Sequence, residues 1–232
     1  MWSQISKWVG ATVLAVALGA SSASALNASY GDFAGTTVDF LNVAESTSGA
    51  DVLFDAPVGV GDGLFFFPSV FAADSAVQPS VSGTLTLHVR AKAGLFLESI
   101  TLEAVGDYTI TGIASASVSA TLDVLDVAPG TNGLFATAAV VTPSTPYTSG
   151  ADAYSGLATV NLAGLGITEV QLTYVNTLTA SSQGGAAFIQ NKVLSGPQIT
   201  AKAGPAVPEP TAAVVFGVGA LLIGARVRRP RA

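Results

Sequence analysis

The chain is 232 residues long, with 15 acidic residues, nine Lys and Arg, one histidine and no cysteine. With no cysteine and a single histidine, the sequence has no ligand set for zinc, no thiol nucleophile and no disulfide. Its formal net charge of −6 repels nucleic acid, which we therefore exclude as a partner.

Residues 1–25 predict a secretory signal peptide. Lys7 supplies the positive charge near its start, residues 9–20 form an apolar segment, and Ala23 and Ala25 make a small-x-small cleavage site before Leu26. An uncleaved N-terminal anchor is the alternative. An exported chain without cysteine must draw its stability from packing rather than from disulfides.

The body of the chain, residues 26–203, predicts an all-β fold. Residues 83–90 alternate cleanly, so that Leu85, Leu87 and Val89 face a core and His88 faces solvent. Similar alternation predicts eight to ten strands joined by turns rich in Gly, Pro and Asn. We expect a two-sheet antiparallel β-sandwich, jelly-roll-like, flanked by an N-terminal signal helix and a C-terminal transmembrane helix. A β-helix is the alternative, but no fixed repeat supports it.

Glycines mark several predicted strand ends. Gly106-Asp107 separates a strand predicted over 95–105 from a long one over 108–127, and residues 168–180 and 186–194 predict two further strands. The alternation of the long segment changes phase at Leu125, which predicts a bulge or a strand that passes between sheets.

The residues that could carry catalysis are few. His88 lies on a regular strand, and no Gly-x-Ser-x-Gly elbow accompanies it, so a Ser-His-Asp triad has no support. Four glutamates of the body are candidates for glycoside hydrolysis, but nothing in their spacing selects a pair: Glu45, Glu98, Glu103 and Glu169. We expect a protein that is not an enzyme.

Calcium is the one cofactor with candidate ligands. Asp62, in a Gly-rich turn over 59–63, and Asp107, after Gly106, offer carboxylate oxygens on turns, as do Asp51 and Asp55. No Asp-x-Asp-x-Asp-Gly loop is present. The alternative is that each aspartate accepts hydrogen bonds from nearby backbone.

The aromatic run Phe65-Phe66-Phe67, with Phe71, predicts either a strand buried on both faces or an exposed hydrophobic patch. A sugar-binding platform would need exposed aromatic rings, and both tryptophans lie in the signal peptide. The tyrosines of the body are therefore its remaining candidates: Tyr30, Tyr108, Tyr147, Tyr154 and Tyr174.

The C-terminal segment has three parts. Residues 204–210 form a linker that ends in Val207, Pro208, Glu209 and Pro210, and these prolines keep the linker extended. Residues 211–225 predict a transmembrane helix, for which a buried core helix is the alternative. Its uncharged stretch, 211–224, would rise about 21 Å against about 30 Å of hydrocarbon, which suits a transient membrane stop. Residues 226–232 predict a basic cytoplasmic tail that stops transfer through its arginines: Arg226, Arg228, Arg229 and Arg231.

Together, Val207-Pro208-Glu209-Pro210, the apolar segment and the arginine cluster resemble the PEP-CTERM sorting signal of Gram-negative bacteria. The resemblance implies an exported surface or extracellular-matrix protein, anchored transiently in the inner membrane and processed by an exosortase-type enzyme that recognises Pro208, Glu209 and Pro210. It also makes exopolysaccharide a reasonable partner. A polysaccharide-binding β-sandwich module is the alternative function, and an acid-pair hydrolase is a third.

Overall fold

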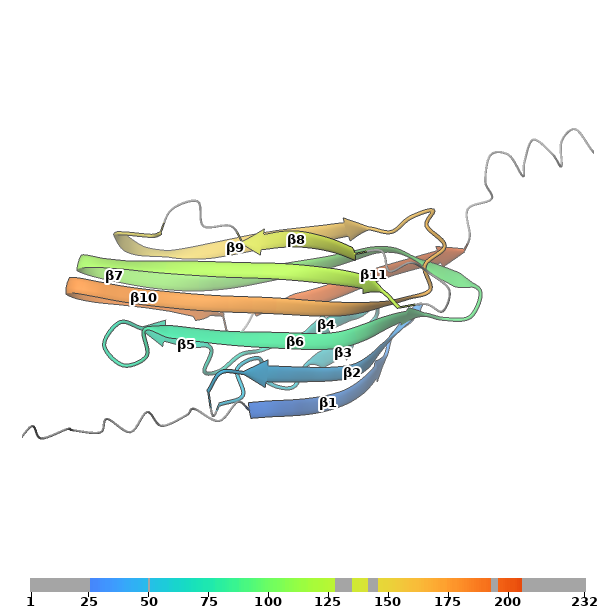
Figure 1. Cartoon of the computed structure of the whole chain (residues 1–232), viewed down its shortest axis with the longest axis horizontal. Helices are drawn as coiled ribbons and strands as arrows, with labels where there is room; N and C mark the ends of the chain where they lie inside the picture. The colour runs from blue at the N-terminus through green and yellow to red at the C-terminus, as the bar shows by residue number, and fades with distance from the viewer. Residues whose placement is uncertain (1–25, 50, 128–134, 142–145, 193–195, 206–232) are drawn as a thin grey trace, which may run out of the picture.

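The computed structural model describes residues 26–49, 51–127, 135–141, 146–192 and 196–205, and their regular structure is entirely β-strand (Figure 1). Each strand pairs antiparallel to its neighbours, so the predicted all-β antiparallel fold is confirmed. The part of the chain that the structure describes includes no helix with the length and apolarity that a membrane crossing needs.

The described strands form one continuous sheet rather than two separate ones. The main path through it runs β1 (Leu26–Ala34), β2 (Val38–Thr47), β6 (Ser80–Ala91), β10 (Glu169–Asn191), β7 (Leu95–Asp126), β11 (Gln198–Pro205), β4 (Gly63–Phe65) and β3 (Val58–Val60). Off this path, β5 (Ala72–Asp74) pairs with β10, while β8 (Phe135–Val141) and β9 (Gly150–Asn161) pair with β7.

The long strands β7 and β10 run through the whole fold, and they reach its left end together in Figure 1. Both carry glycines with positive φ there, 67° at Gly112 and 142° at Gly184, and the pairing shifts register between Ser182 and Gly184. The backbones approach closely, since a Cβ added to Gly185 would lie 1.9 Å from the carbonyl oxygen of Thr111. The glycines therefore let two paired strands bend at a bulge while the ladder continues on both sides of it.

This bend lets one sheet curl into a nearly closed, barrel-like shape. The first half of β7 pairs with β9 and β11, and its second half pairs with β8, while β10 accompanies it from Gly106 to Asp126. Segments predicted as four separate strands are thus two long ones. Gly106-Asp107 and Gly184-Gly185 both lie inside continuous strands, because the partner strand continues opposite them.

The core lies on the inner face of the curled sheet. Leu85, Leu87 and Val89 are fully buried, and His88 faces outward, as the alternation predicted. Burial of each such side chain contributes about 1.5–3 kcal/mol relative to exposure. The predicted phase change at Leu125 is wrong. The alternation continues through it to Asp126, which is a buried residue at an inward position.

Candidate functional site

A pocket of about 260 Å³ lies on the outer face of the layer made by β7, β11 and β4. The strand register brings its lining residues side by side, because Phe65 pairs with Gln198 and Gln198 pairs with Glu103. The pocket is lined by Phe65, Phe66, Phe67, Glu103, Val105, Gly196 and Gln198.

The aromatic run divides between core and pocket. Phe66 and Phe71 are each only 1% exposed and pack in the core, whereas the Phe67 side chain is 39% exposed and Phe65 is half-buried. Two rings therefore supply an apolar wall on the outside of the sheet. The exposed-patch alternative is correct for Phe67 and burial is correct for Phe66 and Phe71, while Phe65 is half-buried.

Two polar side chains complete the pocket. The Gln198 amide Nε2 donates a hydrogen bond to the Glu103 carboxylate Oε2, across the β7–β11 ladder. The pair offers a ligand both an amide and a carboxylate beside the phenylalanine rings. Such a combination of apolar walls with a few polar groups is typical of small-molecule sites.

The four candidate glutamates are not brought together. Glu98 forms an ion pair with Lys202 Nζ at 2.6 Å, and Glu103 accepts a hydrogen bond from Gln198. Glu169 Oε1 lies 2.9 Å from His88 Nδ1. Each side chain thus has its own partner on a neighbouring strand. This geometry provides no acid pair across a cleft for glycoside hydrolysis.

Glu45 is the buried member of the four, only 2% exposed. Its carboxylate accepts hydrogen bonds from the Tyr30 hydroxyl at 2.6 Å and from the backbone N–H groups of Leu53 and Phe54. Burial and the hydrogen bond to Glu45 raise the pKa of Tyr30 well above its usual range. Glu45 therefore fixes the segment after β2. Its partners are 8 to 15 residues away in the sequence, so the local sequence pattern does not predict these contacts.

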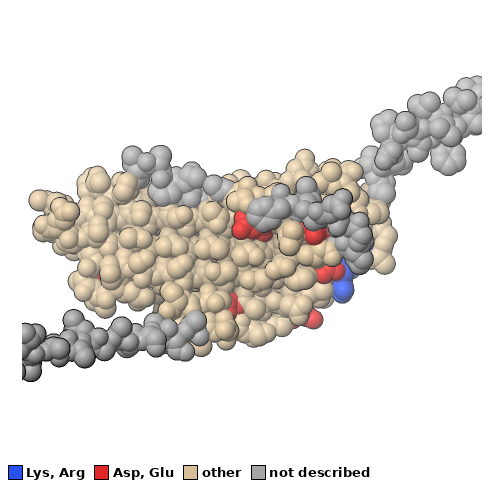
Figure 2. All heavy atoms as spheres, in the orientation of Figure 1, with Lys and Arg blue, Asp and Glu red and all other residues tan. Residues whose placement is uncertain are grey.

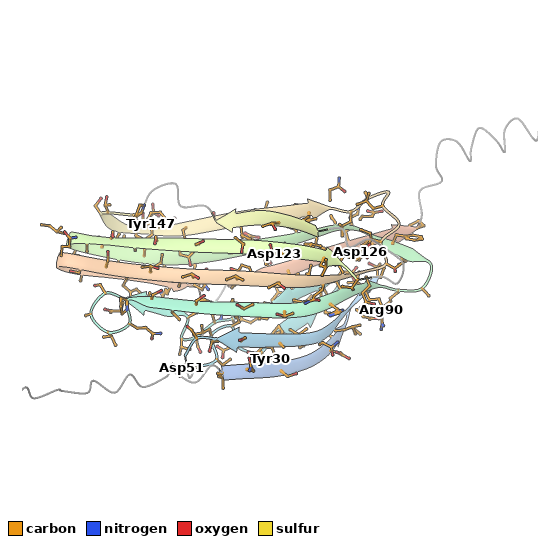
Figure 3. The ribbon with its side chains drawn as sticks, viewed as in Figure 1. Tyr30, Asp51, Arg90, Asp123, Asp126 and Tyr147 are labelled. Carbon is orange, nitrogen blue, oxygen red and sulfur yellow. The ribbon has the colours of Figure 1, made fainter. Side chains whose placement is uncertain are left out.

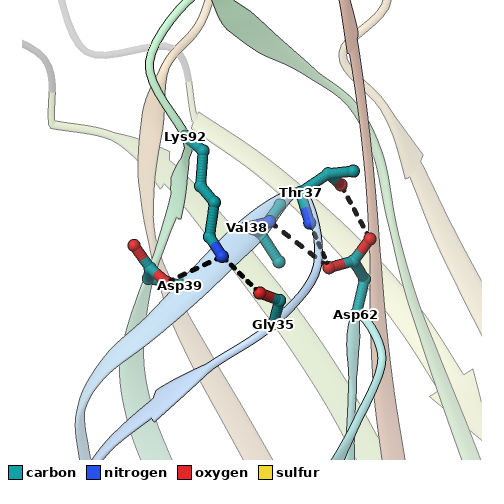
Figure 4. Close-up of polar contacts among 6 residues, drawn as sticks. All are labelled: Gly35, Thr37, Val38, Asp39, Asp62 and Lys92. Carbon is teal, nitrogen blue, oxygen red and sulfur yellow. Dashed lines mark hydrogen bonds and ion pairs between the residues drawn. The ribbon is translucent and has the colours of Figure 1, made fainter.

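Asp62, the first calcium candidate, joins the two free edges of the sheet (Figure 4). Its carboxylate accepts hydrogen bonds from Thr37 N and Thr37 Oγ1, both at 2.7 Å, and from Val38 N at 3.3 Å. Lys92 supports the same turn by donating to the Gly35 carbonyl. Burial by itself would raise the pKa of Asp62, but the hydrogen bonds from Thr37 and Val38 outweigh it and hold the pKa below its usual value.

Two of the other three calcium candidates are also engaged by protein donors. Asp107 Oδ1 accepts from Gln190 Nε2 at 2.9 Å, and Asp55 Oδ2 accepts from the backbone N–H and hydroxyl of Ser69. Asp51 lies apart from Asp123 and Asp126 in Figure 3. Over the described ranges, no group of three or more His, Asp or Glu side chains is placed to hold a metal ion.

The tyrosines do not form an exposed platform. Tyr154 and Tyr174 are buried, and burial raises the pKa of both hydroxyls. Tyr108 and Tyr147 stack on each other, with ring centroids 4.1 Å apart and planes inclined by 11°. Both residues of this stacked pair are half-buried.

The predicted targeting residues lie outside the described residues. These are the cleavage-site alanines, the Pro-Glu-Pro motif and the arginines, namely Ala23, Ala25, Val207, Pro208, Glu209, Pro210, Arg226, Arg228, Arg229 and Arg231. The last described strand, β11, ends at Pro205, two residues before the motif begins.

Comparison with known proteins gives no family. No protein-family description and no curated protein matches the chain. Among solved structures, the enzymatically active domain of tailspike protein 4 from bacteriophage CBA120 matches with a TM-score of 0.23 and 12% sequence identity. The match covers 77% of this chain and 19% of the tailspike chain. A similarity this low carries no inference from the tailspike to this protein.

Proposed function

We propose that the chain is an exported, non-enzymatic surface or extracellular-matrix protein of a Gram-negative bacterium. A signal peptide over 1–25 would direct export, and the apolar segment 211–225 would hold the protein transiently in the inner membrane. An exosortase-type enzyme would then process it near Pro208, Glu209 and Pro210. The resemblance of the C-terminal segment to a PEP-CTERM signal supports this route.

The observation that carries the non-enzymatic part of the proposal is the separation of the glutamates. Each of the four in the described domain is held by a different partner, and Glu45 is buried in contacts that hold the chain together. The described strands, from β1 at Leu26 to β11 at Pro205, lie between the two proposed cuts. Cuts after Ala25 and near Pro208 would leave every described strand intact.

The finer architecture belongs to the same proposal. We infer that the curled sheet works as a flattened, jelly-roll-like sandwich, with its two layers connected through β7 and β10. A stable domain of this kind can present its outer strand faces at the cell envelope without a conformational change.

Mass spectrometry of the protein recovered from outside the inner membrane tests the processing step. We expect the C-terminal peptide containing Arg231 to be absent from this fraction, and to be retained when Glu209 is replaced by Ala. Pro205→Ala, just outside the motif, is the matched control and should still be processed. Recovery of an intact C-terminus from the wild-type protein outside the inner membrane would refute the processing claim.

A polysaccharide-binding module is the second candidate, and the pocket between β4, β7 and β11 favours it. The rings of Phe65 and Phe67 offer apolar faces for the C–H side of a sugar ring, and Glu103 and Gln198 offer hydrogen bonds for its hydroxyls. The volume of about 260 Å³ is suited to a single sugar unit rather than a long segment.

Binding of the full chain to purified exopolysaccharide from the producing bacterium tests this candidate. Phe67→Ala should weaken binding about tenfold, which corresponds to the loss of about 1.4 kcal/mol of contact free energy. Val77→Ala removes another exposed apolar side chain, one that is not part of the pocket lining, and should bind as wild type does. Equal binding by both variants would remove the pocket from the binding surface.

A further inference from the structure

Four buried polar side chains lie in the interior of the curled sheet. Tyr174 and Asn176 lie on the first half of β10 and are 0% exposed, Asn191 is the last residue of β10 and is 2% exposed, and Tyr154 of β9 is 4% exposed. These residues come from opposite halves of the folded sheet. None of them belongs to the outer pocket or to the processing signals.

Asn191 connects the two halves. Its side-chain Oδ1 accepts one hydrogen bond from the Tyr154 hydroxyl at 2.7 Å and another from Asn176 Nδ2 at 3.2 Å. Through this one oxygen, β9 is tied to the part of β10 that pairs with β6. The cluster therefore acts as a polar connection across an otherwise apolar core.

Three polar atoms of the cluster have no hydrogen-bond partner among the described residues. They are the Tyr174 hydroxyl, Asn176 Oδ1 and Asn191 Nδ2. Rotating both asparagine amides by half a turn exchanges donors for acceptors along the Asn176–Asn191–Tyr154 chain, but it still leaves three polar atoms without a partner. The deficit is therefore a property of the residues and not of the chosen amide orientation.

Small residues surround the cluster. Gly106 of β7 pairs with both Asn191 and Tyr154, and Gly83 and Ala120 flank Asn176 on its two neighbouring strands. The Tyr154 ring lies directly over Gly106, since a Cβ added there would come 2.1 Å from Tyr154 Cζ. The absence of a side chain at Gly106 therefore leaves room for the Tyr154 ring, whose hydroxyl reaches Asn191.

Buried polar atoms in folded proteins are almost always hydrogen-bonded, either to protein or to ordered water. The unpartnered set here contains an amide donor, a carbonyl acceptor and a hydroxyl that can serve as either, and it carries no charge. A cation would be repelled by the amide N–H groups, and an apolar ligand would leave all three atoms unsatisfied. The complementary ligand is a small neutral molecule that both donates and accepts hydrogen bonds.

We propose that the cluster of Tyr154, Tyr174, Asn176 and Asn191 is an internal binding site for ordered water, which completes the polar connection between the two halves of the sheet. Water accepts from Asn191 Nδ2 and donates to Asn176 Oδ1, with the Tyr174 hydroxyl as the remaining partner. The bound water is then a structural component of the domain and exchanges only slowly with solvent.

Nuclear Overhauser measurements between water and the side-chain amides of the full chain, with ¹⁵N-labelled asparagine, test the site. Long-lived water should give cross-peaks of the slow-tumbling sign at Nδ2 of Asn176 and Asn191. The exposed Asn27 amide is the internal control and should give only the signature of short-lived hydration water. Tyr174→Phe checks for proton exchange through that hydroxyl, and the Asn191 cross-peak should survive it.

A high-resolution crystal structure of the full chain gives a second readout that does not depend on resolving the amide signals. Electron density of water size within hydrogen-bond distance of Asn176 Oδ1 and Asn191 Nδ2 would support the proposal. Absence of a long-lived cross-peak, loss of the Asn191 cross-peak in Tyr174→Phe, or direct bonding of the two amides to Tyr174 in a dry core would each overturn it.

Discussion

The sheet is closed in two different ways. At the left end of Figure 1, β7 and β10 pass without a break from one half of the sheet to the other. Between the free edges β1 and β3 there is no continuous ladder, and the Asp62 carboxylate connects the β3–β4 turn to Thr37 and Val38 instead (Figure 4). The first closure depends on backbone shape and the second on a charge.

The charged residues are distributed differently at the two closures of the sheet. No charged residue occurs within 108–122 or 170–191, the parts of β7 and β10 around the bend. On the face shown in Figure 2, most visible acidic and basic side chains lie in the right half, away from that end. The comparison teaches that pH should act on the Asp62 connection and leave the bend unaffected, whereas added side-chain volume should do the reverse.

Gly185→Val should have the largest effect. A Cβ at this position would meet the Thr111 carbonyl oxygen at 1.9 Å and the backbone N of Ile113 at 2.8 Å, and neither backbone atom can move without breaking the β7–β10 ladder. We expect a loss of at least about 3 kcal/mol of unfolding free energy, measured by urea denaturation. Gly49→Ala is the control, since nothing lies within 4 Å of its added Cβ. Equal midpoints for the two variants would contradict a tight bend.

Asp62→Ala should have the next largest effect. The substitution removes the acceptor of three hydrogen bonds and leaves the Thr37 and Val38 N–H groups without it, so we expect a loss of about 2–3 kcal/mol in the same assay. Asp51→Ala removes an exposed carboxylate and should change the unfolding free energy by less than about 0.5 kcal/mol. A loss of similar size in both variants would point to overall charge rather than to this connection.

Local alternation explains what was predictable from the sequence. The inward positions of Leu85, Leu87 and Val89 follow from a period of two, which any strand with one buried face must show. The error at Leu125 has the same origin. The sequence has an apolar residue at Leu125 and a charged one at 126, which indicates a break in the alternation, whereas the structure continues the alternation and buries Asp126. Local pattern alone does not say when a polar residue takes an inward position.

Contacts between distant segments explain what was not predictable. Asp62 meets Thr37 across 25 residues of sequence, and Tyr154 meets Asn191 across 37. Each pair depends on which strands become neighbours, and single-sequence periodicity does not contain that information. The glycines at 184–185 show the same limit, because a bend inside a continuous strand has the same local composition as a turn between two strands.

The pH dependence of the Asp62 connection should be a smaller effect than its removal. Its folded pKa is depressed below the unfolded value of about 3.9, so the carboxylate contributes stability that is fully present above about pH 5. This contribution is lost as the pH falls through the folded pKa. The difference in unfolding free energy between wild type and Asp62→Asn should therefore be constant from about pH 5 to 8 and shrink below about pH 4. A difference that does not vary with pH would show that the charge of Asp62 is not involved.

Calcium should have the smallest effect on the fold. The carboxylates of Asp62, Asp107 and Asp55 already accept hydrogen bonds from protein donors, and a cation would have to displace those donors before it could bind. Calorimetric melts of the full chain with calcium and then with chelator should have the same midpoint to within about 1 °C, because a ligand stabilises a protein only by its preference for the folded state. A calcium-dependent rise that Asp62→Asn abolishes would instead assign the ion to the Asp62 connection, and would mean that the connection can open under native conditions.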